Sequence, residues 1–208
     1  MNKVNFITLF FTLAVFASGW YLGSSDENVV IASSVGGKSY GGRYDTEDRS
    51  SGAVKIRSTE GQTHIINPGD SIQAAVELAK PGDTIQVMPG RYSETVYIDK
   101  DDIHLMGRII DGNRATLDGL ETLNDAILYS GNDIIVENFK IIDYKGNGIM
   151  SQAGNNFEIR NNIIVDTGIY GIFPQLGKNG LIEHNVVSGI ADAAIYVGMS
   201  DNIHVAYN

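Results

Sequence analysis

Residues 133–208 decide the fold; broken every 23 residues, they read DIIVENFKIIDYKGNGIMSQAGN, NFEIRNNIIVDTGIYGIFPQLGK, NGLIEHNVVSGIADAAIYVGMSD and NIHVAYN. Three apolar columns recur at this period: Val136, Ile159, Ile182 and Val205; Ile141, Ile164 and Val187; and Ile149, Ile172 and Ile195. Short columns rich in Ile and Val, separated by Gly, Asn and Asp, are typical of three strands and three turns. The fixed period indicates a solenoid, and the repeat predicts an all-β parallel β-helix with coils of about 23 residues.

Two polar columns accompany the apolar ones. One consists of Asn162, Asn185 and Asn208, with Phe139 at the equivalent position of the earliest coil. Since stacked parallel strands place equivalent residues about 4.8 Å apart, we expect these amides to lie inward at a turn and to bond from coil to coil. The other column is Glu137, Arg160 and Glu183, whose alternating sign predicts a charge ladder on the surface.

The N-terminal part differs in composition from the repeats. An apolar run, Phe6–Leu22, follows Lys3 and predicts a signal peptide or an uncleaved membrane anchor within residues 1–25. Residues 26–62 are interpreted as a flexible spacer, or else as an arm lying on the domain. The β-helix domain is expected over residues 63–208, exported to the periplasm or cell exterior or anchored facing outward. Because residue 208 falls in mid-coil, we also expect this domain to be truncated at its C-terminal end.

Composition excludes several kinds of site. Cysteine is absent, which removes disulfides, thiolate metal sites and a cysteine nucleophile. The net charge of −10 and the lack of a basic stripe argue against nucleic-acid binding. They also make an acidic polymer an awkward ligand unless a cation or a local basic patch assists. Asp111-Gly112 and Asp118-Gly119 are interpreted as turns rather than as a glycosidase carboxylate pair.

The segment before the repeats predicts a cap for the solenoid. Residues 71–79, SIQAAVELA, place four small or apolar residues on one helical face, and Asp70 with Gln73 is expected to form a capping box. Strands are expected over residues 84–88, 95–98 and 103–106. The whole run GDSIQAAVELAKPGDTIQVMPGRYSETVYI, residues 69–98, resembles the N-terminal cap and first coil of pectin-lyase-like, right-handed parallel β-helix proteins. That resemblance implies the fold, which hosts lyases, hydrolases, epimerases, adhesins and non-enzymatic proteins.

The strand that begins at Ile149, Ile172 and Ile195 carries the candidate binding surface. Period-two alternation points one column outward, namely Met150, Phe173 and Tyr196, beside a second column, Gln152, Gln175 and Gly198, with Tyr170 near the turn. Aromatic faces beside amides suit sugar rings, which have an apolar face surrounded by hydroxyls. The other interpretation is that the spacer or a loop packs over this surface.

A second resemblance falls on the same strand. Tyr170-Gly171-Ile172-Phe173-Pro174-Gln175 resembles the catalytic coil of mannuronan C5-epimerases, which reads Y-G-I-D-P-H-D. Phe173, Gln175 and Leu176 stand where that family has its catalytic Asp, its His and a second Asp. Neither phenylalanine nor glutamine can accept the proton, so the resemblance implies a groove position without the chemistry.

Asp143 and Asp166 form one further column, 23 residues apart. Stacked carboxylates suit Ca²⁺, but the favoured interpretation is two solvated turn aspartates that also cap local backbone N–H groups. No other cofactor is expected, and the catalytic residues stay unassigned.

The sequence therefore predicts an exported β-helix protein, related to carbohydrate-active lyases and epimerases. It would act on or bind a polysaccharide, for example one containing uronic acids. The alternative is a non-catalytic surface-structural or adhesion module. The expected partner is a polysaccharide, with no nucleic acid, and with a membrane contacted only through the N-terminal segment.

Overall fold

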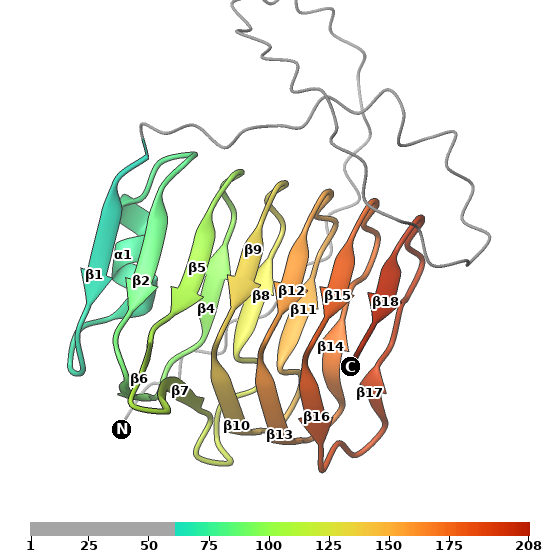
Figure 1. The fold of residues 1–208 in the computed structure, drawn as a ribbon. Helices are drawn as coiled ribbons and strands as arrows, with labels where there is room; N and C mark the ends of the chain where they lie inside the picture. The colour runs from blue at the N-terminus through green and yellow to red at the C-terminus, as the bar shows by residue number, and fades with distance from the viewer. Residues whose placement is uncertain (1–60) are drawn as a thin grey trace, which may run out of the picture. The chain divides into compact units, whose positions relative to one another are not determined.

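The computed structural model describes residues 61–208, which form three parallel sheets around one core (Figure 1). The first sheet has the order β1 (Thr63–Ile66), β2 (Thr84–Val87), β5 (His104–Gly107), β9 (Ile135–Glu137), β12 (Glu158–Arg160), β15 (Leu181–Glu183) and β18 (His204–Ala206). The second has β16 (Val186–Ser188), β13 (Ile163–Thr167), β10 (Lys140–Tyr144), β7 (Asn113–Asp118) and β3 (Gly90–Tyr92). The third has β17 (Ala193–Ile195), β14 (Tyr170–Phe173), β11 (Ile149–Ser151), β8 (Ile127–Tyr129) and β4 (Val96–Ile98). The predicted all-β solenoid is confirmed; the predictions for residues 1–60 lie outside the described residues.

The strand registers follow the sequence repeat. Ile159 pairs with Val136 on one side and with Ile182 on the other, and Ile149 pairs with Ile172. These inward residues are fully or almost fully buried, and burying such a side chain stabilises the fold by about 1.5–3 kcal/mol. The three predicted apolar columns therefore face the core of the three sheets, although burial decreases toward the last coils, where Val187 and Ile195 are partly buried and Val205 is 44% exposed.

The predicted asparagine column is a hydrogen-bond ladder, in which Asn162 and Asn185 are buried and Asn208 is exposed. Asn162 Oδ1 accepts from the backbone N–H of Phe139 at 3.0 Å, and Asn162 Nδ2 donates to the carbonyl of Val136 at 3.1 Å. Asn185 Oδ1 in turn accepts from the backbone N–H and the Nδ2 of Asn162. Asn208 repeats this contact with Asn185. Each amide thus satisfies backbone groups that a tight buried turn would otherwise leave unpaired.

The charge ladder is confirmed in part. Arg160 Nε lies 2.9 Å from Glu137 Oε2, but its Nη1 lies 3.0 Å from Glu158 on its own strand instead of reaching Glu183. His104 Nε2 lies 2.7 Å from the other Glu137 oxygen. The hydrogen bond from His104, with the Arg160 charge, lowers the pKa of Glu137 despite its partial burial. The ladder therefore ends at Arg160.

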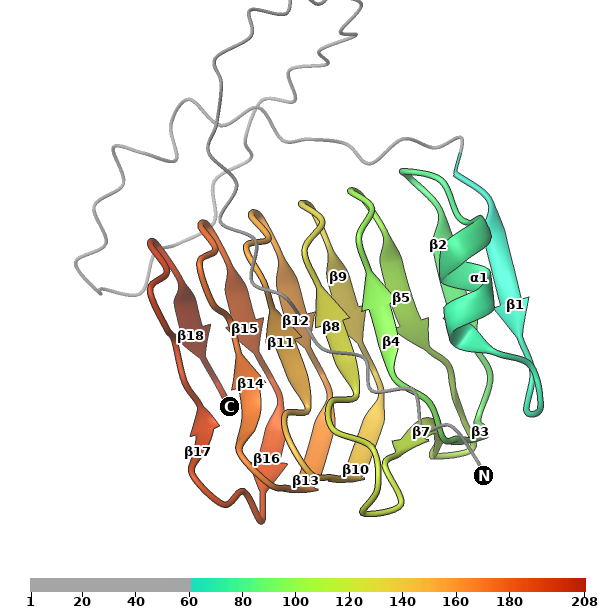
Figure 2. The ribbon, with the colours of Figure 1, turned by 180° about the vertical axis from the view of Figure 1, so that it is seen from behind.

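One short helix, α1 (Ile72–Leu78), packs beside β1 and β2 at the start of the stack (Figure 2). Its buried face is Ile72, Ala75 and Val76, as predicted. The N-cap prediction is wrong: Ser71, not Asp70, caps the helix, with Oγ accepting from the backbone N–H of Ala74. The reason is that Asp70 accepts from the backbone N–H of Asn67 and closes the preceding turn.

The next coil holds both ends of α1. Glu94 accepts from the backbone N–H groups of Ile72 and Gln73. The Gln73 side chain forms no capping box, because it bonds to the backbone of Tyr97 instead. Lys100 Nζ donates to three carbonyls at the C-terminal end of the helix, those of Val76, Glu77 and Ala79. A carboxylate at the N-terminus and an ammonium at the C-terminus also complement the helix dipole. No helix among residues 61–208 is long and apolar enough to cross a bilayer.

One coil is longer than the others, because Leu105 of β5 pairs with Val136 of β9 rather than with a residue 23 positions on. The additional chain includes a hairpin in which β6 (Ile109–Ile110) pairs antiparallel with β7. Asp111 and Gly112 form its two-residue loop with φ of 51° and 77°, the left-handed pair that a type I′ turn requires. The turn predicted for Asp111-Gly112 is thus confirmed, and the hairpin extends from the N-terminal end of β7 in the second sheet.

A buried carboxylate near the start of the solenoid gives a pH-dependent prediction. Burial alone would raise the pKa of Asp83, but hydrogen bonds from the backbone N–H of Lys80 and from His64 outweigh burial and lower that pKa to about 2. A carboxyl group with a lower pKa in the folded state stabilises the fold above the unfolded-state pKa, near 4. It loses this contribution as the pH falls toward 2.

We therefore expect Asp83→Asn to lower the free energy of unfolding by about 2 kcal/mol at neutral pH. The difference from the unaltered chain should shrink between pH 4 and pH 2. Urea unfolding at several pH values measures it, and a difference that does not change with pH would contradict the assignment.

Candidate functional site

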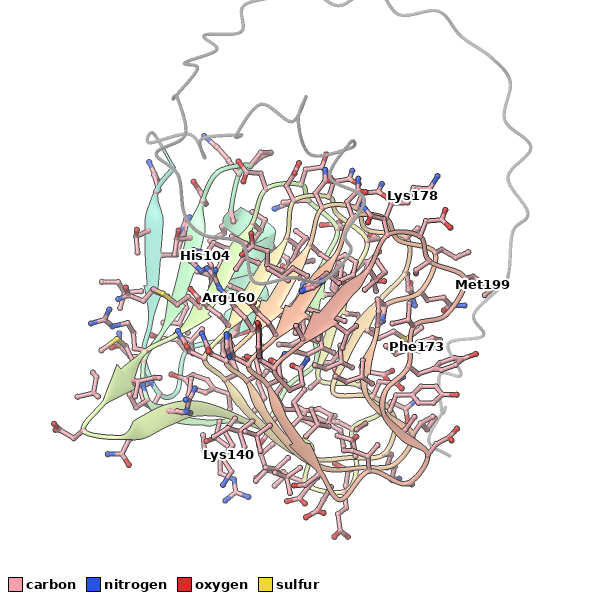
Figure 3. All side chains as sticks on the ribbon, turned by 45° about the vertical axis from the view of Figure 1, so that its right-hand side comes forward. His104, Lys140, Arg160, Phe173, Lys178 and Met199 are labelled. Carbon is pink, nitrogen blue, oxygen red and sulfur yellow. The ribbon has the colours of Figure 1, made fainter. Side chains whose placement is uncertain are left out.

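Three aromatic rings gather on the outward face of the third sheet, and we call Tyr170, Phe173 and Tyr196 the aromatic cluster. The ring centroids of Tyr170 and Phe173 are 4.8 Å apart, those of Tyr170 and Tyr196 are 5.0 Å apart, and those of Phe173 and Tyr196 are 5.2 Å apart. The two tyrosine rings are stacked, with 25° between their planes. Figure 3 shows Phe173 directed away from the coil, on a different side from Lys140 and Arg160.

The strand register explains this cluster. Ile172 faces the core opposite Ile195, so Phe173, the next residue on β14, faces outward beside Tyr196. Gly198 makes room for the ring, because a Cβ there would lie 2.7 Å from Cε2 of Phe173. Glycine in the predicted outward column therefore lets the Phe173 ring lie over the neighbouring coil.

The same column continues across the whole third sheet. Met150 pairs with Phe173 and with Leu128, and Leu128 pairs with Tyr97. We call this row the outward stripe: Tyr97, Leu128, Met150, Phe173 and Tyr196. Its five strands span about 19 Å at 4.8 Å per strand. Sequence reasoning found only the last three members.

Two of the predicted amides flank the stripe. Gln152 is exposed and Gln175 is half-buried. The Ser151 hydroxyl accepts from the backbone N–H of Gln175 at 2.8 Å and donates to its carbonyl at 3.0 Å. The backbone pairing places Gln175 opposite Gly198. All six predicted binding residues thus lie in or beside β11, β14 and β17 of three neighbouring coils, and three of them meet in the aromatic cluster.

One titratable group of the cluster, the Tyr170 hydroxyl, has a shifted pKa. Desolvation by its neighbours, followed by the charge of Asp192 and a hydrogen bond to that carboxylate, raises the pKa of Tyr170. The hydroxyl therefore stays protonated at neutral pH and acts as a donor rather than as a base. Phe173 and Gln175 cannot titrate, so these residues can stack and hydrogen-bond but cannot abstract a proton.

Asp143 and Asp166 lie within β10 and β13 rather than at turns, in left-handed conformations with φ of 59° and 55°, and Gly189 continues their column at 67°. Asp and Gly are residue types that adopt this conformation readily, which accounts for the column without a cation. Among residues 61–208, no three His, Cys, Asp or Glu side chains gather as a metal site would require.

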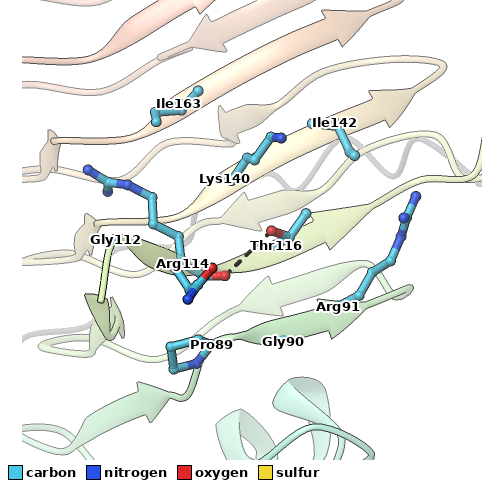
Figure 4. Close-up of a pocket in the computed structure, with 10 residues that line it drawn as sticks. Pro89, Gly90, Arg91, Gly112, Arg114, Thr116, Lys140, Ile142 and Ile163 are labelled. Carbon is cyan, nitrogen blue, oxygen red and sulfur yellow. Dashed lines mark hydrogen bonds between the residues drawn. The ribbon is translucent and has the colours of Figure 1, made fainter. Parts of the chain in front are cut away.

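A groove that the sequence did not predict lies over the second sheet (Figure 4). It has a volume of about 720 Å³ and is lined by Pro89, Gly90, Arg91, Gly112, Asn113, Arg114, Thr116, Lys140, Ile142 and Ile163. Three of these residues are cationic and none is acidic. We call it the basic groove. It supplies the local basic patch that the net charge alone would not suggest.

The unequal spacing of the earlier coils explains why the sequence did not predict this groove. Thr116 pairs with Arg91 on β3 and with Lys140 on β10, so Arg91 and Lys140 share one outward column. The pairs are 25 and 24 residues apart, and the 23-residue alignment that worked from residue 133 onward does not bring them together. The Asp111-Gly112 turn was a sequence signal for the groove, because a hairpin that extends from one coil must lie beside the strands of the adjoining coils.

The comparisons with known proteins agree with this architecture. The family model described as "Right handed beta helix region" matches residues 55–208. No curated protein and no solved structure matches the chain. Since the matched residues make up most of the 208-residue sequence and coincide with the described solenoid, the chain belongs to the right-handed beta helix family.

Proposed function

We propose that this chain binds a polysaccharide along the outward stripe of the third sheet. The observation that carries the proposal is the aromatic cluster, in which three rings lie within 4.8–5.2 Å of one another on an outward sheet face. Tyr196 is 46% exposed and Tyr97, at the other end of the stripe, is 39% exposed. Such rings beside amides favour a ligand that is apolar on one face and rich in hydroxyls at its edge.

The stripe also suits an extended chain. Its side chains repeat at about 4.8 Å, close to the length of one sugar unit, so successive units could stack on successive coils. Gln152 and Gln175 would then hydrogen-bond the hydroxyls. The proposal includes an exported protein, which is supported by the apolar run Phe6–Leu22.

The proposed role is binding without turnover at this surface. The resemblance to epimerases places Phe173 and Gln175 where that family has its Asp and His, and the Tyr170 hydroxyl is held protonated. Release of unsaturated sugars from a uronic-acid polymer by the purified chain would contradict this part of the proposal.

We expect Phe173→Ala to weaken the binding of oligosaccharides by about fivefold to tenfold, because the central ring of the cluster is lost. Isothermal titration calorimetry with neutral and uronic-acid oligosaccharides measures the effect. Tyr207→Asn is the matched control. Tyr207 is 80% exposed, and its left-handed position is occupied by Asn138 and Asn161 in earlier coils. Unchanged affinity for Phe173→Ala, or an equal loss for Tyr207→Asn, would contradict the proposed surface.

A further inference from the structure

We propose that the basic groove is a second binding site, specific for the negatively charged groups of an acidic polysaccharide. The chain carries 25 acidic and 15 basic residues, so its surface repels anions in general. The groove departs from this background, because Arg91, Arg114 and Lys140 line it and no carboxylate does. The inference stands apart from the aromatic cluster, which lies on another sheet.

The cations lie in a regular arrangement. Arg91, Thr116 and Lys140 are register partners on β3, β7 and β10, so Arg91 and Lys140 are about 10 Å apart at two strand spacings. Figure 4 shows their side chains, with that of Arg114, rising from neighbouring strands on the same side of the sheet. An extended glycan that lies along this column would have an acidic group near each cation and a hydroxyl near Thr116.

The charges are available to a ligand. Within residues 61–208 the Lys140 ammonium has no ion-pair partner. Arg114 Nη1 donates to the carbonyl of Asn161 at 2.9 Å, which fixes the side chain, and no carboxylate in the described part of the chain compensates its charge. Arg91 pairs with Asp118, which is fully buried, while the Arg91 side chain itself stays 63% exposed. Arg91 thus neutralises Asp118 and still presents N–H groups to the groove.

The rest of the lining favours a sugar over other polyanions. Pro89, Ile142 and Ile163 place apolar surface beside the cations, which matches a sugar ring that carries a carboxylate or a sulfate. Nucleic acid requires a longer basic stripe, and three cations on a strongly acidic domain fall short of one. The ligand chemistry is therefore an oxyanion on a saccharide chain.

Binding of the full chain to four polymers at low salt tests the inference: polygalacturonate, dextran sulfate, neutral dextran and single-stranded DNA. We expect one or both of the acidic glycans to bind, and more weakly as the salt concentration rises. We expect Lys140→Gln and Arg114→Gln each to weaken this binding about threefold to tenfold. Lys178→Gln is the charge-matched control, since Lys178 is exposed and its ion pair with Asp201 is long, at 3.7 Å.

The two acidic polymers distinguish which oxyanion the groove binds, since polygalacturonate carries carboxylates and dextran sulfate carries sulfates. The inference is overturned if neither glycan binds, if Lys178→Gln weakens binding as much as Lys140→Gln, or if DNA binds more tightly than both. Phe173→Ala in the same assay keeps the two proposals distinct. If only Lys140→Gln and Arg114→Gln weaken binding, the basic groove is supported and the aromatic surface is contradicted. If only Phe173→Ala weakens binding, the basic groove is overturned.

Discussion

Asn162→Ala is expected to lower the free energy of unfolding by about 3 kcal/mol. Asn162 is completely buried, and its amide serves groups on both neighbouring coils. Alanine would leave the buried N–H of Phe139 without its acceptor and remove the side-chain donor to the carbonyl of Val136, and a buried group left unpaired costs about 1–3 kcal/mol. It would also remove one of the two groups that bond to Asn185 Oδ1. Urea unfolding followed by circular dichroism measures the difference.

Asn124→Ala is a suitable control for this change. Asn124 is exposed and its backbone carbonyl, which alanine retains, makes the contact with Gly146. The control should change the stability by less than about 0.5 kcal/mol. If the two alanine variants are equally stable, the ladder does not hold the coils together.

Phe157→Ala is expected to destabilise the domain by about 3–5 kcal/mol. The ring is 1% exposed, and its centroid lies 5.6 Å from that of Tyr129 on a neighbouring coil. Gly180 packs against the other side of the ring so closely that a Cβ there would overlap it. The surroundings are backbone and aromatic atoms that can relax only a little, so the truncation should leave a cavity.

Phe173→Ala provides the matched control, because it removes the same side chain from an outward position on the third sheet. Its effect on stability should stay below about 1 kcal/mol while its effect on sugar binding is large. Thermal unfolding of both variants tests the contrast. Equal losses of stability would mean that Phe173 belongs to the core rather than to a binding surface.

The sequence predicted the register of the last coils because every contact there repeats at one spacing. Ile159, Ile172 and Asn162 each have a partner 23 residues away, so alignment of the repeats was equivalent to stacking the strands. Earlier coils depart from that spacing. Tyr97 and Leu128 were therefore missed as members of the outward stripe, although they occupy the same column as Met150.

Other features depend on contacts that no local pattern contains. Asp70 is a good N-cap by residue type, yet a hydrogen bond to Asn67 takes its side chain, and Glu94 from the following coil serves the helix instead. The basic groove likewise combines Arg91, Arg114 and Lys140 from three strands through their register. Only the stacking of unequal coils brings these charges together.

The extended coil that bears the hairpin has a thermodynamic consequence. Loop-closure entropy grows only with the logarithm of length, and a doubling costs about 0.6 kcal/mol. The register of Leu105 with Val136 closes 31 residues instead of 23, so the added chain should cost only a few tenths of a kcal/mol in closure entropy. The hairpin, which lines part of the basic groove, can therefore change in length or sequence with little effect on whether the coils stack. Changes in this part of the surface are then nearly independent of the requirements for folding.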